Sequence, residues 1–466
     1  MTKQSIIWST LFAVALFILF AGSTSAAVSE EEAGQLGTTL TEFGAEKGGN
    51  ADGSIPAYTG GLPTCRAGAD RYEDPFKGEK PLFTIDAKNV SKYDSILTTG
   101  TRALIKRFPE TYKIDVYPAH RTVCYPSWVI QNTLKNAGTA KIGGEIEGDA
   151  ITGVDEKGLP FNGIPFPIPK NGYEVMWNSK LHIAPPVDHN WSSAAIVDTA
   201  GRISTLPEVN HYYLHPWYEK SGDMRRKASD AVLGISSRLT SPPSSAGTKF
   251  LLLYMPDAAE GGQRVWLYTP GKRHIGKAPE FSYDIPITAY SGSLLWDEMF
   301  GFVGRMDRFD FKLIGKKEII IPYNVFGLTN HTTLEEVLGP RHVKPNYVRW
   351  EKHRVWVVDS VRKSSAHHLY SRRTFYMDED SWCILSTESY DNSGKMWRVA
   401  YIYTFPTYDV FGVNNASWSF NDLIKGNYSL VNAGRKMPGK FVRSYAESKS
   451  LDIPLSPQAV EGSGVR

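Results

Sequence analysis

Three histidines in the second half of the chain are the side chains best suited to hold a metal ion. His353, His367 and His368 lie close to Asp359 in the sequence, and imidazole and carboxylate groups are common ligands of zinc. Neighbouring residues on a strand point to opposite faces, so His367 and His368 share a metal only if they sit in a turn. Solvated turn histidines are the simpler interpretation, and we predict no metal site.

Carboxylates that act as general acids or bases need a shielded environment that tunes their pKa. Asp378, Glu379 and Asp380 lie between two predicted strands, so we interpret them as the polar tip of a hairpin.

Gly271–Lys277 has the spacing of a phosphate-binding P-loop, but Ala278 replaces the hydroxyl residue that would hold Mg²⁺. The sequence contains no GxSxG, HExxH, kinase or Rossmann signature. We therefore predict no catalytic residue, no cofactor and no enzymatic activity.

Basic residues are concentrated between positions 341 and 373, where nine of them face two acidic residues. Four of the nine are Arg349, Arg354, Arg372 and Arg373. Charged side chains protect an exposed strand from aggregation, so a solvated strand face explains them. The alternative is a surface that contacts anionic lipid headgroups or an acidic protein.

Four strand-forming segments, separated by short turns, surround these residues. They are Val343–Asp359, Leu369–Met377, Trp382–Tyr390 and Met396–Phe405. Turns rich in Asp, Asn and Gly between such segments predict consecutive hairpins. Trp397, Val399, Tyr401 and Tyr403 alternate along the last segment, which predicts an apolar sheet face.

The first 26 residues have the pattern of a cleaved targeting segment. Lys3 precedes the apolar run Ile6–Phe20, and the small residues Thr24 and Ala26 predict cleavage after Ala26. A membrane anchor is the alternative, although the run is shorter than the roughly 20 residues that span a bilayer. Cleavage leaves 466 − 26 = 440 residues, and the loss of Lys3 lowers the formal net charge from +3 to +2. This charge gives no indication of nucleic-acid binding.

Three cysteines remain in the mature chain: Cys65, Cys124 and Cys383. Export permits disulfide formation, and Cys65–Cys124 is the pairing that we predict. Three unpaired thiols are the alternative. The spacings exclude CxxC redox chemistry and the usual zinc arrangements.

The segment before the strands contains several other elements. Glycines and Pro56 indicate a turn-rich strap at residues 40–61, and helices are expected near residues 86–108 and 126–135. Ile164, Phe166 and Ile168 alternate with proline, which predicts an extended strip that cannot join a central strand. The strip either packs along a sheet edge or forms a lid over an apolar opening.

Consecutive hairpins with helices clustered early in the chain indicate an α+β fold. We expect residues 27–180 to form the strap, helices and proline-rich strip, which pack on a sheet. Residues 181–430 are expected to form a large curled antiparallel sheet, an incomplete β-barrel whose concave side is covered by helices. Residues 431–466 form a polar C-terminal tail, whose end from Ser444 onward is expected to be mobile.

Several motifs resemble a Gram-negative family known as domain of unknown function 1329. They lie at residues 40–46, 49–56, 265–273, 315–324, 353–358, 373–382 and 390–399, and the similarity covers nearly all of the mature chain. The resemblance implies a relation to periplasmic lipoprotein-sorting proteins of the Lol type. It implies an incomplete β-barrel whose apolar hollow is covered by helices and holds acyl chains, and it supplies no catalytic residues.

We therefore predict a periplasmic carrier or chaperone. It would bind a hydrophobic or lipid-like molecule, including lipoprotein acyl chains, and transfer it to or from the outer membrane without catalysis. Candidate residues lining the hollow are Trp266, Tyr268, Phe309, Phe311, Trp356, Val358, Trp397 and Tyr401. Ordinary core packing is the alternative for each of them.

Two other functions remain open. A structural adaptor would connect an exporter of the resistance-nodulation-division class to an outer-membrane protein through the basic strands. A periplasmic lipid esterase would need a shielded serine or aspartate beside a histidine.

Overall fold

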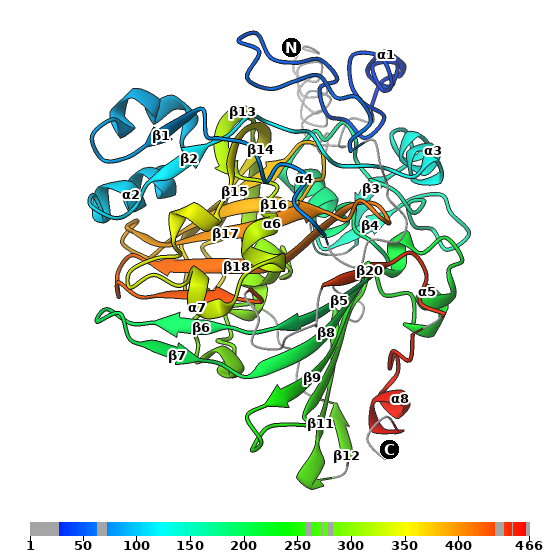
Figure 1. Cartoon of the computed structure of the whole chain (residues 1–466). Helices are drawn as coiled ribbons and strands as arrows, with labels where there is room; N and C mark the ends of the chain where they lie inside the picture. Colours follow the sequence, from blue (N-terminus) through cyan, green and yellow to red (C-terminus); the bar gives the residue numbers. More distant parts are fainter. Residues whose placement is uncertain are drawn as a thin grey trace, which may run out of the picture.

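The computed structural model describes residues 28–62, 72–144, 146, 148–257, 262–272, 274–277, 283–433, 442–449 and 451–462. Their strands form two large sheets and a small hairpin, with short helices packed around them (Figure 1). The predicted targeting segment, residues 1–26, and Cys65 of the predicted disulfide lie outside the described residues. Among the residues described, no helix is both long enough and apolar enough to cross a membrane.

The larger sheet comprises eleven strands in the described part of the chain. In spatial order they are β1 (Phe83–Ile85), β2 (Ile114–Val116), β14 (Trp350–Arg362), β15 (Arg372–Asp378), β16 (Ile384–Tyr390), β17 (Met396–Pro406), β18 (Val413–Asp422), β19 (Tyr428–Val431), β6 (Ala195–Val197) and β7 (Ile203–Thr205), with β13 (Phe309–Pro322) paired to β14. The predicted meander is confirmed, because β14, β15, β16 and β17 pair consecutively and antiparallel. Only the short contact between β2 and β14 is parallel among the strand pairs described.

Both faces of the larger sheet are buried. Val399, Tyr401 and Tyr403 of β17 pack in one apolar cluster, and the alternate residues Ala400 and Ile402 pack in another on the opposite face. Helix α2 (Thr99–Arg107) contacts β17 on the first face, while α4 (Gly172–Lys180) and η5 (Trp296–Gly301) contact β13, β14 and β16–β18 on the second. Helical segments therefore cover both sides of the sheet around β17.

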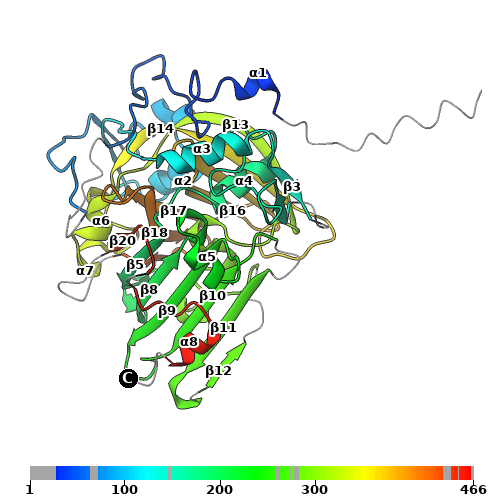
Figure 2. The ribbon, with the colours of Figure 1, turned by 90° about the vertical axis from the view of Figure 1, so that its right-hand side faces the viewer.

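The smaller sheet has seven strands among those described and extends below the larger sheet (Figure 2). Its spatial order is β12 (His274–Lys277), β11 (Gln263–Thr269), β10 (Lys249–Tyr254), β9 (Leu233–Ser241), β8 (Glu208–Leu214), β5 (Val187–Ser192) and β20 (Arg443–Tyr445). The predicted hairpin between residues 249 and 270 is confirmed as β10–β11. The chain passes from the smaller to the larger sheet between Ser192 and Ala195, where β5 ends and β6 begins.

The C-terminal segment is part of the fold where the structure describes it. Strand β20 pairs with β5 at the sheet edge, and α8 (Pro457–Gly462) packs against β10, β11 and β12. The expectation of a mobile end from Ser444 onward did not include this paired strand and this packed helix. Val460, which is fully buried, supplies the apolar contact that anchors α8.

The other elements are short. They are α1 (Glu30–Ala33), α3 (Ser127–Asn136), α5 (Asp223–Lys227), α6 (Phe326–Asn330), α7 (Leu334–Val337), η1 (Val90–Ile96), η2 (Pro216–Tyr218), η3 (Pro270–Lys272), η4 (Thr288–Tyr290), η6 (Pro345–Tyr347), β3 (Lys141–Gly143) and β4 (Ala150–Thr152). The helix predicted near residues 126–135 is confirmed as α3. The helix predicted near residues 86–108 is divided into η1 and α2, because Leu97 is extended and the Thr98 hydroxyl caps α2 by accepting from the Thr101 amide.

The α+β prediction, with a large and mainly antiparallel open sheet, is confirmed. The structure adds that the strands after residue 186 divide between two sheets. This division exposes one face of the smaller sheet to the segment at residues 283–301, and the candidate site lies between them.

Candidate functional site

One face of the smaller sheet carries rows of mostly apolar side chains across β8, β9, β10 and β11. The register aligns Tyr213 with Ile235, and Ile235 with Leu252. The next row aligns Ser237 with Phe250. Because side chains two residues apart on a strand share a face, these residues form one continuous wall.

The segment at residues 285–299 crosses this wall without closing onto it. A cavity of about 350 Å³ remains between them. The segment contributes Ile285, Pro286, Ile287, Thr288, Tyr290, Trp296 and Met299 to its lining, and Trp418 of β18 adds a contact from the larger sheet. The cavity thus lies where the two sheets diverge, under a cover made by η4, η5 and the residues between them.

The lining of this apolar cavity contains no Asp, Glu, Lys or Arg among the described residues. Its titratable histidine, His211, shares a hydrogen bond of 2.6 Å with the Ser237 hydroxyl. Burial lowers the pKa of His211 to about 3, with a further contribution from His189. The imidazole is therefore neutral at pH 7, and the cavity offers an uncharged, water-poor environment of a size that suits a hydrophobic ligand.

A second cavity, of about 60 Å³, continues along the same sheet face. Leu233, Tyr254 and Gln263 line it and form the row beyond Ile235 and Leu252. Lys180, His182, Asp297 and Arg305 also line this second cavity, which we therefore call the polar cavity. Trp296 lines both cavities. The two hollows together have an apolar part and a charged end.

The eight residues predicted to line a hollow do not line the apolar cavity. Phe309, Phe311 and Val358 are buried in the main core, whereas Trp266 and Tyr268 lie on the opposite face of the smaller sheet in the cluster that includes Val460 of α8. Strand alternation separates the two faces. A prediction that is shifted by one residue along a strand therefore selects the wrong face of the sheet.

The three remaining predicted residues belong to the larger sheet. Trp356 packs against the main core, and the indole of Trp397 donates a hydrogen bond to Asp422 over 2.9 Å. Tyr401 borders a hollow of about 10 Å³ and hydrogen-bonds Thr101 at 2.8 Å. The structure does not bring these three residues together around one ligand-sized space.

The proline-rich strip is mostly buried in the core. Ile164 and Phe166 belong to the main core, and Ile168 is half-buried. The Ile164 amide donates to Thr133 of α3 over 2.9 Å, and the Trp217 indole donates to the carbonyl of Gly163 over 2.9 Å. None of the three apolar residues lines the two cavities described above.

The basic strand residues are mostly internal. Arg349 pairs with Glu351 at 2.5 Å, Arg354 with Glu46 at 3.1 Å, and Arg373 with Asp297 at 2.9 Å. All three arginines are buried, and only Arg372 of the four predicted headgroup contacts is exposed. Glu351 is local, but Glu46 and Asp297 come from distant parts of the chain, so a count of charges between residues 341 and 373 could not include them.

The acidic run at the β15–β16 turn is also internal, so its assignment to a solvated hairpin tip is wrong. Asp378, Glu379 and Asp380 are each at most 2% exposed. Arg121 donates to both carboxylate oxygens of Asp380, at 2.9 and 2.6 Å, and Lys316 donates to Glu379 at 2.8 Å. The N-terminal segment supplies Arg121 and thereby neutralises a turn that is charged when considered alone.

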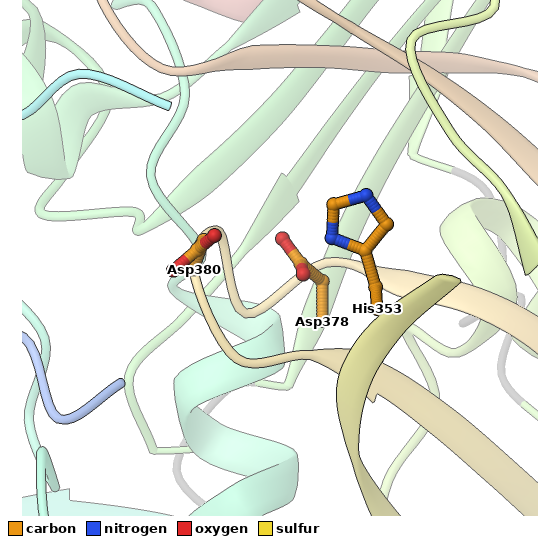
Figure 3. A group of neighbouring side chains, drawn as sticks. All are labelled: His353, Asp378 and Asp380. Atoms are coloured by element: carbon orange, nitrogen blue, oxygen red, sulfur yellow. The ribbon is translucent and has the colours of Figure 1, made fainter. Parts of the chain in front are cut away.

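The prediction that the three histidines are solvated in a turn is wrong for two of them. His353 and His368 are buried, and only His367 is exposed. His353 lies beside Asp378 and Asp380 (Figure 3), with one ligand atom of each of the three residues within 4.8 Å of the others. This is the arrangement in the described residues closest to a metal site.

Existing hydrogen bonds indicate that this cluster is a charge network. Both oxygens of Asp380 are held by Arg121, and one oxygen of Asp378 accepts from Tyr323 at 2.9 Å and from Ser381 at 2.7 Å. Burial and the adjacent Asp380 raise the pKa of Asp378, which favours its protonated form. A metal ion would have to displace the guanidinium of Arg121 from Asp380, so the arrangement suits proton sharing and ion pairing better than metal binding.

Sequence comparison assigns the chain to a family. Residues 84–460 match the family model described as protein of unknown function DUF1329. A relative from Pseudomonas aeruginosa, uncharacterized protein PA3922, is 36% identical over 461 residues, which is 96% of each chain.

Solved structures show weaker similarity. An outer membrane lipoprotein-sorting protein domain from Vibrio parahaemolyticus aligns with a TM-score of 0.40 and 13% identity, covering 62% of this chain and 98% of that one. A DUF1329 family protein from Desulfovibrio piger aligns with a TM-score of 0.37 and 14% identity, covering 60% and 97% respectively. The family model and the full-length relative together show that this chain belongs to the DUF1329 family.

Proposed function

We propose that the protein is a periplasmic carrier that binds a hydrophobic or lipid-like molecule and releases it without covalent chemistry. The observation that carries the proposal is the apolar cavity of about 350 Å³ between the smaller sheet and residues 285–299. Empty apolar space inside a protein forfeits dispersion contacts with the atoms that would fill it. A cavity of this size is therefore better explained by a ligand than by core packing.

Hydrocarbon supplies the binding energy in this proposal. Each buried CH₂ group contributes about 0.8 kcal/mol before ordering costs. The uncharged lining forms no ion pair that would have to break when the ligand leaves. Release then requires either a receiver that binds the ligand more tightly or movement of the cover at residues 285–299.

Export to the periplasm is the second part of the proposal. It rests on the sequence pattern of Lys3, the apolar run Ile6–Phe20 and the small residues before Ala27. A carrier for lipid acyl chains, including those of lipoproteins, has substrates in that compartment at both membranes. Partners at the outer membrane or in an exporter belong to this proposal as receivers or donors of the ligand.

Filling the cavity tests the proposal directly. Leu239 lines the cavity, whereas its neighbour Thr240 does not, because the Thr240 hydroxyl donates to the carbonyl of Glu208 over 3.2 Å. The exported full-length protein, Leu239→Trp and the matched control Thr240→Trp are purified, and bound lipid is measured by native mass spectrometry and solvent extraction. We expect bound amphiphile in the wild type and in Thr240→Trp, and at least a fivefold loss in Leu239→Trp.

Two results would contradict the carrier function. One is a wild-type protein without extractable amphiphile that also fails to bind an added fluorescent fatty acid. The other is equal lipid content in both tryptophan variants. Circular dichroism establishes that each variant is folded before its lipid content is compared.

A lipid esterase is a second candidate, because the Ser237 hydroxyl and His211 form a hydrogen-bonded pair in the cavity. A general base works best with a pKa near the operating pH, whereas burial lowers the pKa of His211 to about 3. Its Nε2 atom is buried without a hydrogen-bond partner, so no carboxylate orients the ring as in a catalytic triad. We expect no hydrolysis of a long-chain nitrophenyl ester. Turnover that Ser237→Ala abolishes would establish the esterase instead.

A further inference from the structure

Lys180 places a positive charge at the polar cavity and forms no ion pair within the part of the chain that the structure describes. It is the last residue of α4, and its ammonium lies 4.7 Å from the ring centre of Trp177 and 5.7 Å from that of Phe302. Among the described residues no carboxylate lies within ion-pair distance of it. Lys180 is half-buried, and partial desolvation of a charge that has no ion-pair partner is costly.

The acidic residues around Lys180 are already engaged with other cations. Asp149 pairs with Arg305 at 2.8 Å, and Asp297 pairs with Arg373 at 2.9 Å and with His368 at 3.0 Å. Burial lowers the pKa of Lys180 to about 8, although the charge of Asp149 opposes this shift. Most of the protein therefore carries an ammonium at this position at pH 7, and that ammonium lies near two aromatic rings.

A second polar group in the same cavity also lacks a partner. His182 is buried, and its Nδ1–H donates to the carbonyl of Ser179 over 2.8 Å. This bond leaves Nε2 as an acceptor, and Nε2 has no hydrogen-bond partner. A ligand headgroup, with the water or hydroxyl that accompanies it, would satisfy both Lys180 and His182.

The position of Lys180 relative to the apolar cavity determines the shape of such a ligand. The wall runs along β9 from Leu233, in the polar cavity, to Leu239, in the apolar cavity. Six residues of strand span about 20 Å, and Trp296 lines both hollows. A single acyl chain lying along this wall would place its head beside Lys180.

We propose that Lys180 binds the carboxylate head of a single-chain fatty acid whose tail occupies the apolar cavity. This inference rests on the proposed carrier function and adds the class of ligand. One ammonium in a space of about 60 Å³ suits a monoanionic carboxylate better than a dianionic phosphate, which favours several cationic donors. Arg305 remains bound to Asp149 and contributes only to the positive potential around the head.

The test compares two ligands that differ only in the head. Dissociation constants for dodecanoate and dodecan-1-ol are measured by calorimetry at pH 7 on the delipidated exported protein. The variants are Lys180→Met, which keeps the length of the side chain, and Lys227→Met, a control at an exposed lysine of α5. We expect Lys180→Met to weaken dodecanoate binding about tenfold or more, because a charge-assisted hydrogen bond is lost. Dodecan-1-ol binding changes less than twofold, and Lys227→Met changes neither.

The possible outcomes separate this inference from the carrier function. If dodecanoate and dodecan-1-ol bind equally to wild type and to Lys180→Met, the carrier stands and the role of Lys180 is refuted. Equal weakening of both ligands in Lys180→Met refutes it as well, because Lys180 then only shapes the cavity. If neither ligand binds the wild type, both proposals fail. Lys180→Gln provides the same comparison if Lys180→Met does not fold.

Discussion

Arg121 illustrates how single charges attach the N-terminal segment to the larger sheet. Its guanidinium donates to both oxygens of Asp380 and to the backbone carbonyl of Glu46 at 2.7 Å. It also stacks over Tyr58, 5.4 Å from the ring centre. Because these groups are buried, removal of the cation leaves an uncompensated negative charge in the interior.

Arg121→Met is therefore expected to lower the free energy of unfolding by about 3–5 kcal/mol, the usual effect of breaking a buried pair from one side. Urea denaturation followed by tryptophan fluorescence measures it. Arg202→Met is the control, because Arg202 pairs with Asp198 on the surface and should leave the midpoint unchanged. Similar midpoints for the two variants would show that the Asp380 network does not stabilise the fold.

Buried histidines make the protein sensitive to acid. Burial lowers the pKa of His215 to about 3, with a contribution from His182, against about 6.5 in an unfolded chain. As the pH falls, the unfolded state takes up the proton first. The stabilisation is therefore complete above about pH 6.5 and is lost progressively as the pH falls toward 3.

His215→Phe removes this dependence. Between pH 6 and pH 4 the slope of unfolding free energy against pH should decrease by about 1.4 kcal/mol per pH unit. Urea midpoints at three pH values give the slope, which a constant packing defect does not alter. An unchanged slope would mean that His215 titrates normally in the folded protein.

At the scale of elements, α8 covers the face of the smaller sheet opposite the cavity. Val460 packs there in a cluster with Ala228, Leu251, Leu253 and Tyr268. The cavity wall and the α8 face are the two sides of one sheet. Loss of α8 packing should therefore loosen the strands that carry the wall.

Val460→Asp should lower the free energy of opening for the amides of β10, β11 and β12 by about 3 kcal/mol, because a carboxylate would be buried without a partner. Hydrogen exchange detected by mass spectrometry measures this change. Strands β16 and β17, in the middle of the larger sheet, provide the internal reference and should keep their protection. Uniform loss in all five strands would instead indicate global unfolding.

Much of the element pattern could be predicted from the chain itself. Turns with Asp, Asn and Gly located the hairpins β15–β16 and β16–β17, and helix α3 begins one residue after its predicted start. The site was harder to locate, because strand alternation says which residues share a face but not what covers that face. Trp266 and Tyr268 belong to a correctly predicted strand and lie under α8, whereas their neighbours Val265 and Leu267 belong to the opposite face.

At the scale of the whole molecule, a ligand that binds only the folded state must stabilise it. If dodecanoate occupies the cavity, a free concentration of 100 times Kd should raise the unfolding free energy by about 2.7 kcal/mol. Thermal or urea unfolding with and without the ligand measures this increase. Leu239→Trp should lose the response and Thr240→Trp should keep it, whereas no response in the wild type would contradict binding in the cavity.

The amino-acid sequence by itself determined the α+β class, the meander and the family, because turn chemistry, side-chain alternation and long motifs are local properties. Only the tertiary structure decided that the strands divide into two sheets and that the segment at residues 285–299 leaves an apolar cavity between them. It also decided that Asp378–Asp380 and three of the four arginines are internal. Burial depends on partners such as Arg121 and Glu46, which lie hundreds of positions away in the chain, so no local pattern of charge or hydropathy contains it.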